Sequence, residues 1–71
     1  MKFLNGLTVN IKSTDGTIVA TGTVLDSWYE SDGKGQVETY HLNPISGDCK
    51  QFMDSSGRVV CHVDELSLQE K

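Results

Sequence analysis

The chain has 71 residues, of which 37% are hydrophobic and 23% are charged. This length allows one domain, residues 1–71, and the composition excludes a disordered chain, which needs low hydrophobicity and a large net charge. The net charge is −4, and from residue 25 onwards four cations stand against nine acids. Because the few lysines and arginines form no cluster, binding to nucleic acid or to an anionic membrane is disfavoured.

The sequence also bears on the compartment. No segment approaches the length of a transmembrane helix. The start, MKFLNGLTVNIK, breaks at Asn5–Gly6 and has no apolar core, so we expect no signal peptide. We therefore expect a cytoplasmic protein in which Cys49 and Cys61 are reduced. If the chain were secreted, a disulfide between these two cysteines would be the alternative.

Alternation of apolar and polar residues defines the first two predicted strands. Residues 7–12 alternate and predict a strand with one buried face. Asp15–Gly16 follows and predicts a tight type I′ hairpin, in which both central residues have positive φ. The next run, residues 17–29, is long for one strand, and Gly22 could supply a bend or bulge that lets it serve two sheets. The alternation slips near Leu25, which indicates a second bulge.

Shorter elements fill the rest of the chain. The segment SDGKG predicts a flexible loop, and DSSGR predicts a hairpin with Gly57 as its left-handed residue. Asn43–Pro44 should end the strand before it, because proline cannot donate to the ladder. Asp64–Glu65 should form a single helical turn. The predicted strands are residues 36–42, 49–53, 58–63 and a short closing strand at 66–68.

About a dozen apolar residues must form the core of so small a domain. We choose them from the alternate strand positions whose side chains are expected to point inward. The predicted core is Val9, Ile11, Ile18, Ala20, Val24, Tyr40, Leu42, Phe52, Val59, Cys61 and Leu66.

Five or six short strands joined by tight turns predict a small barrel, because closure removes exposed edges. The ending GRVVCHVDELSL resembles the end of SH3-like barrels, with a glycine turn, a strand, one helical turn and a short closing strand. DGTIVATGTV is similar to the strand–glycine–strand stretch of KOW-type barrels. The resemblance implies an all-β fold, a small SH3-like barrel of five to six antiparallel strands with one short helical turn near the C-terminus. The OB-fold is the main alternative.

This resemblance implies no functional residues. The chain lacks the ALYDY-like motif of peptide-binding SH3 domains, and it lacks the basic character of KOW modules. Its function must therefore be predicted from the residues themselves.

Metal binding is not favoured by the spacing of the metal-ligating residues. The side chains with the atoms that zinc prefers are His41, Cys49, Cys61 and His62. They form no C-x-x-C or H-x-x-x-H pair, and adjacent residues on a strand point to opposite faces. We therefore expect Cys61 to be a core residue, His62 to be solvated, and the protein to hold no metal or cofactor.

Calcium binding and catalysis are also disfavoured. The acids Glu30, Asp32 and Glu38 surround two glycines, but they match only part of an EF-hand loop and are flanked by strands. Cys49 could pair with His41 if their strands are neighbours. A catalytic thiol also needs a pocket and an orienting third group, and a barrel of this size has little room for them. We expect no enzymatic activity.

Trp28 and Tyr29 are the most informative pair. On a regular strand two adjacent residues cannot both point inward. We expect Trp28 to be mostly buried at one end of the barrel and Tyr29 to point outward. An exposed aromatic ring beside an acidic loop is a reasonable anchor for a partner. The candidate partner-binding residues are Trp28, Tyr29, Glu30, Asp32, Lys34, Tyr40 and His41.

These observations predict a non-enzymatic protein–protein interaction module. The acids Asp26, Glu30, Asp32 and Glu38 should steer a partner with a basic surface. By analogy, a small acidic protein of this kind could be a phage or mobile-element inhibitor of a host protein. Homodimerisation through a free strand edge would use the same surface.

Two other classes stay open at this point. A nucleic-acid module would use Lys12, Lys34, Lys50 and Arg58 together with an aromatic ring for stacking. A thiol or metal-binding domain would use Cys49 and Cys61.

Overall fold

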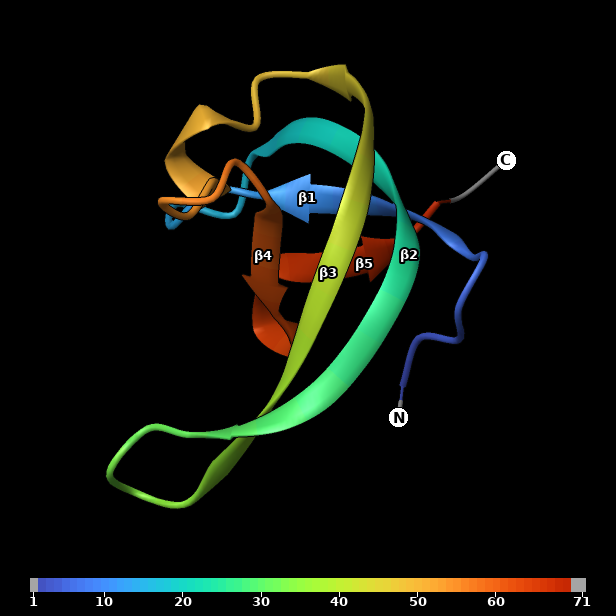
Figure 1. Ribbon diagram of the computed structural model, residues 1–71. Coiled ribbons are helices and arrows are strands. Elements are labelled where there is room, and N and C mark those ends of the chain that lie inside the picture. The colour runs from blue at the N-terminus through green and yellow to red at the C-terminus, as the bar shows by residue number, and fades with distance from the viewer. Residues whose placement is uncertain (1, 70–71) are drawn as a thin grey trace.

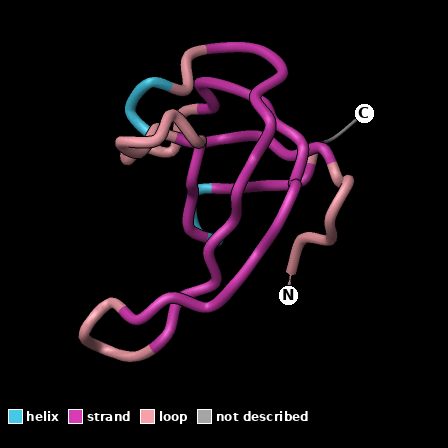
Figure 2. Tube along the Cα trace, in the orientation of Figure 1, coloured by secondary structure: helices cyan, strands magenta, loops and turns pink. Residues whose placement is uncertain are grey.

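The computed structural model describes residues 2–69, which form one curved antiparallel sheet (Figures 1 and 2). The strands are β1 (Thr8–Lys12), β2 (Ile18–Ser31), β3 (Gln36–Gly47), β4 (Val59–His62) and β5 (Leu66–Leu68), in the order β4-β3-β2-β1-β5. The only helical segments among these residues are two single 3-10 turns, η1 (Lys50–Phe52) and η2 (Val63–Glu65). None of the described helical turns has the length or the apolar character to cross a bilayer.

The all-β prediction is confirmed. The chain ends as the sequence indicated, with strand β4, one helical turn η2 and the short strand β5. Strand β2 is the longest element and serves both halves of the sheet, since its first part pairs with β1 while the stretch from Ala20 to Ser31 pairs with β3. In Figure 1, β1 and β5 run across the direction of β2 and β3, and the β2–β3 hairpin extends beyond the rest of the sheet. We call the outer part of this hairpin, residues 25–41, the arm.

Register shifts occur where the alternation of the sequence breaks. Val24 pairs with Leu42 and Asp26 pairs with His41, so Leu25 is an extra residue in β2, as predicted. The register also shifts at Gly22, but the extra residue there belongs to β3 rather than to β2. Each bulge moves all following side chains of its strand to the opposite face.

Two predicted strand boundaries are wrong. Strand β3 does not end at Asn43–Pro44 but continues to Gly47. Strand β4 pairs with β3 only as far as Leu42, so proline lies where that side of β3 is unpaired and its missing N–H costs nothing. Residues 49–53 are not a strand, because they close the turn η1, in which the Phe52 N–H donates to the Cys49 carbonyl at 3.0 Å.

Two residues of the predicted core are not buried in the structure, and two other residues are buried in their place. Ile18 is 54% exposed, because Val19 is an extra residue in the β1–β2 ladder and turns Ile18 to the face of Lys12. Phe52 is only half-buried against the core. The places are taken by Phe3 and Cys49. The buried hydrophobic residues are Phe3, Val9, Ile11, Ala20, Val24, Tyr40, Leu42, Cys49, Val59, Cys61 and Leu66.

The first hairpin is not the predicted type I′ turn. Gly16 has a φ of 86°, but no non-glycine residue among those described has positive φ. The Ser13 N–H donates to the Thr17 carbonyl at 2.9 Å and the Gly16 N–H to the Ser13 carbonyl at 3.0 Å, which is a longer loop ending in one left-handed glycine. The turn at residues 54–58 has the same pattern, and its left-handed residue is Gly57, as predicted.

The Asp15 side chain holds the first of these turns together. Its Oδ1 accepts hydrogen bonds from the Ser13 hydroxyl and from the Thr17 N–H, the latter at 2.9 Å. These two bonds, in that order of size, lower the pKa of Asp15 to about 2. The charged carboxylate therefore stabilises the hairpin.

Replacing Asp15 with asparagine should make the acid dependence of folding shallower. A lowered folded pKa means that the carboxylate contributes stability above its ordinary pKa of about 4, and that this contribution is lost as the pH falls towards 2. The urea midpoint of Asp15→Asn should lie below that of the wild type at pH 7, and the difference should shrink between about pH 4 and pH 2. Asp54, whose pKa is also lowered, is present in both proteins, so its contribution to the pH dependence cancels in the difference between them. If the difference between the two urea midpoints stayed the same from pH 7 to pH 2, the Asp15 carboxylate would not stabilise the hairpin.

Candidate functional site

The pairing of the strands gives the arm two distinct faces. Trp28 pairs with Thr39, and Thr39 pairs with His62. Directly paired residues of an antiparallel sheet lie on the same face. Ser27 pairs with Tyr40, a core residue. Tyr40 therefore marks the core side of the sheet, and Trp28 lies on the outer face.

The outer face of β2, β3 and β4 carries a mixed aromatic, aliphatic and histidine surface. Thr39 at its centre is 0% exposed, and its hydroxyl donates to the Val37 carbonyl at 3.2 Å. Trp28 and His62 flank it on the neighbouring strands, and both are half-buried. The Nε2 atom of His62 lies 3.9 Å from the Glu30 carboxylate. We call this surface the outer patch: Asp26, Trp28, Glu30, Val37, Thr39, His41, Val60 and His62.

The predicted division between Trp28 and Tyr29 is half right. Tyr29 is 55% exposed, as expected. Trp28 is half-buried, but it does not close the end of a barrel, because it lies on the face opposite the core. Tyr29 is on the core side of the arm and is exposed because the core ends before it. The bulge at Leu25 decides this arrangement, since without it the two rings would exchange faces.

Tyr40 belongs to the core and cannot contact a partner. Its ring is 0% exposed and packs edge-on against Phe3, with the ring centroids 5.5 Å apart. Its hydroxyl accepts the Phe3 N–H at 3.1 Å and donates to Oε1 of Glu38 at 2.7 Å. Burial raises the pKa of Tyr40, and the tyrosine hydroxyl lowers the pKa of Glu38. His41, another residue of the predicted site, is half-buried and lies on the outer patch.

The tip of the arm, where the sequence predicted a loop, is a short turn. Gly33, with a φ of 89°, and Lys34 are its two central residues. The Asp32 N–H donates to the Gly35 carbonyl at 3.1 Å, and the Asp32 carboxylate accepts the Lys34 N–H at 2.9 Å. This turn lies at the far end of the arm from η1, as Figure 1 shows, so the lysines of these two segments do not form one basic surface.

The acids of the arm are divided between its faces. Asp26 and Glu30 lie two residues on either side of Trp28 on the outer patch. Glu38 is on the core side and is engaged by Tyr40 and by the Lys2 N–H, which lies 2.8 Å from its Oε1. The structure thus brings Trp28, Glu30 and His41 of the predicted site together, and leaves Tyr29 and Tyr40 on the other face.

Neither cysteine offers a reactive thiol. Cys49 and Cys61 are free and buried in the core. Burial raises the pKa of Cys49, and it raises that of Cys61 to about 12, so both thiols stay protonated at neutral pH. His41 lies on the outer face, away from Cys49 in the core, so the two residues do not form the pair considered above. Cys61 and His62 point to opposite faces, as predicted.

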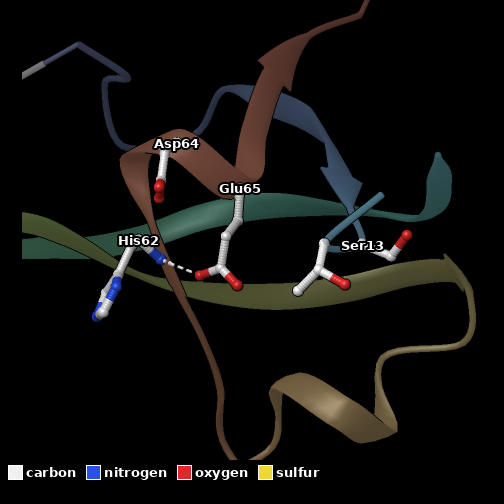
Figure 3. Close-up of a pocket in the computed structure, with 5 residues that line it drawn as sticks. Ser13, His62, Asp64 and Glu65 are labelled. Atoms are coloured by element: carbon white, nitrogen blue, oxygen red, sulfur yellow. Dashed lines mark hydrogen bonds between the residues drawn. The ribbon is translucent and has the colours of Figure 1, made fainter. Parts of the chain in front are cut away.

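A shallow hollow of about 330 Å³ lies where β4 turns into η2 (Figure 3). It is lined by Ser13, Thr14, His62, Asp64 and Glu65. One imidazole nitrogen and two carboxylates there lie within 4.8 Å of one another, a donor set that could hold a cation. Oε1 of Glu65 already accepts the His62 N–H at 2.7 Å and so caps the start of η2. This capping accounts for the position of Glu65 without a metal.

Several residues of the outer patch were not in the predicted site. Val37, Val60 and His62 join it because their strands lie next to one another, and only the register of β3 against β4 shows this. Their alternation along each strand identified the faces but not the neighbours.

Comparison with known proteins gives no relative. No family model, no curated protein and no solved structure matches the chain. The function must be argued from the geometry of the arm.

Proposed function

We propose that this domain is a non-enzymatic protein-binding module whose contact surface is the outer patch. The observation that carries the proposal is the position of Trp28, half-buried on the face turned away from the core and set between two acids of its own strand. Tryptophan is enriched among the residues that dominate binding energy, especially where neighbouring side chains already exclude part of the solvent.

The core does not require this tryptophan. Trp28 is neither one of the buried core residues nor one of the partly buried residues packed against them. On the outer face it is paired with the fully buried Thr39 and remains partly exposed to solvent. A large aromatic side chain that the core does not need is best explained by a contact that completes its burial.

The charge of the arm indicates the kind of partner. Four acids and one lysine lie in residues 25–41. Asp26 and Glu30 border Trp28 directly, so a partner with a basic surface would gain attraction on approach, and salt would weaken it. Blocking of a host protein by a phage or mobile element is one form that such binding could take.

The remaining side chains support a binding role in the cytoplasm. The thiols, which are the strongest nucleophiles of the chain, are enclosed and held protonated. Two free buried cysteines fit a reducing compartment.

Exchange of Trp28 for alanine should weaken partner binding by more than about tenfold, because loss of a central tryptophan typically costs about 2 kcal/mol or more. Tyr29→Ala is the matched control, since it removes an exposed ring at the next position on the opposite face. The partner would first be isolated by affinity capture from the native host and then titrated by calorimetry against both variants.

The fold of each variant would be checked by circular dichroism before binding is compared. Binding should also weaken when salt is raised from about 0.1 M to about 1 M. If Tyr29→Ala is the variant that loses affinity, or if folded Trp28→Ala binds as the wild type does, the outer patch is not the contact surface.

A further inference from the structure

Strand β2 has a free backbone edge along the arm. Strand β1 pairs with β2 only over Ile18–Thr23, and Val24 makes the last bonds on that side, to Gly6 and Leu7. From residue 25 to residue 31, the backbone hydrogen bonds between strands within the described chain go to β3 alone. This stretch is therefore an edge strand on the side away from β3.

The hydrogen bonds of the tip show which groups face this edge. Because the Asp32 N–H donates to the Gly35 carbonyl, residues 32 and 35 form a hydrogen-bonded pair, and such pairs alternate along an antiparallel ladder. Ser27, Tyr29 and Ser31 then belong to the non-bonded pairs and direct their N–H and C=O groups to the free edge. The Ser27 N–H agrees with this, since it donates to the Asp26 carboxylate at 2.8 Å, a local bond that an added strand would replace.

The side chains on the outer face of this edge follow a simple pattern. Asp26, Trp28 and Glu30 stand at alternate positions, so the edge presents an acid, an aromatic ring and a second acid. A strand laid against it would place its own alternate side chains directly opposite these three. Opposite charges and apolar pairs at such positions stabilise strand pairing.

We propose that the edge of β2 binds an extended basic segment of the partner protein by strand addition. Its basic side chains lie opposite Asp26 and Glu30, and an apolar side chain between them lies opposite Trp28. This inference rests on the proposed function and specifies which kind of segment the partner would present.

A second copy of this chain fits the edge poorly. The antiparallel register that pairs residues 25–31 with the same residues of a copy puts Trp28 opposite Trp28. It also puts Asp26 opposite Glu30 twice. Like charges directly opposite one another destabilise a strand pair. Pairing of this edge with the same edge of a second copy is therefore disfavoured, and pairing with a basic strand is favoured.

A nitrogen-15 NMR titration with short synthetic peptides tests the proposal. The probe is the capped heptapeptide Thr-Lys-Thr-Val-Thr-Lys-Thr, in which the two inner threonines would face Ser27 and Tyr29. One variant carries N-methyl groups on these threonines. The matched control carries the same number of N-methyl groups on the valine and on one lysine, whose amides would point away from the edge.

The unmodified peptide should shift the amide signals of Ser27, Tyr29 and Ser31. Methylation of the inner threonines should weaken binding by about tenfold or more, and methylation of the outward amides should weaken it much less. A peptide with glutamate in place of both lysines should not bind.

Equal affinity of the two methylated peptides would overturn strand addition, because it would show that the peptide binds by charge attraction without backbone hydrogen bonds to the edge. So would the absence of amide shifts at millimolar peptide, or a protein that dimerises through this edge. These outcomes are separate from the proposed function, which fails only if affinity for the captured partner is independent of Trp28.

Discussion

Gly47→Ala should unfold the domain. Gly47 has a φ of 85°, a conformation that costs a residue with a Cβ atom about 1 kcal/mol or more. The added Cβ would also overlap the Val19 carbonyl oxygen and lie 2.5 Å from the Cα atom of Ala20. Both obstacles are backbone atoms of β2, so neither can rotate away. Gly47 pairs with Ala20 at the end of β3, and relief of the overlap would separate the two strands there.

The expected loss of at least about 3 kcal/mol is comparable to the whole stability of a domain of this size. Gly57→Ala is the matched control, because Gly57 has nearly the same φ, 87°, with no atom within 4 Å of an added Cβ. It should cost only about 1 kcal/mol. Urea denaturation followed by tryptophan fluorescence would measure both variants. Similar losses in the two variants would show that the backbone conformation, and not the overlap, is what requires glycine.

Local alternation predicted the strands well wherever the ladder is regular. β1, the first part of β2, and β4 lie close to where the period of two placed them, and the slip at Leu25 is a real bulge. The segment before the first strand was not predicted to contribute to the core. Phe3 lies before the first strand, and only its contact with Tyr40 shows that it belongs to the core.

The candidate site was predicted as a continuous stretch of sequence, but in the structure its residues are divided between the two faces of the sheet. The bulge at Leu25 was foreseen, but the face that it gives to Trp28 was predicted wrongly, because one extra residue reverses the faces and only the partner strand shows where it is inserted. His62 joins the outer patch from β4, a strand outside the predicted stretch. Such neighbours depend on the register between strands, which short-range patterns do not determine.

The same distinction explains why stability and binding are separable in this domain. Tyr40 and Trp28 lie on neighbouring strands of the arm but face opposite sides of the sheet. Substitutions on the core side should therefore change the free energy of unfolding, and substitutions on the outer patch should change affinity. Thr39 is the exception, because it is enclosed on the outer face and joins the two.

Tyr40→Phe should lower the free energy of unfolding by about 1–3 kcal/mol, because it leaves the buried N–H of Phe3 without its acceptor. Tyr40→Ala should cost about 3–5 kcal/mol, since it also empties the space beside the Phe3 ring. Tyr29→Phe is the control for loss of a hydroxyl. Its ring is exposed, and the change should stay within about 0.5 kcal/mol.

The pH dependence separates the two bonds of the Tyr40 hydroxyl. The bond to Glu38 lowers the pKa of that carboxyl, so it contributes stability above the ordinary pKa of about 4, and this is lost as the pH falls through the lowered value. The difference between the wild type and Tyr40→Phe should therefore shrink in acid, leaving the part due to the Phe3 N–H, which does not titrate. Denaturation curves at a series of pH values would show both parts. A difference that is constant from neutral pH to about pH 2 would mean that Glu38 gains nothing from the tyrosine, and no difference at all would mean that the N-terminal segment is held by the Phe3 ring alone.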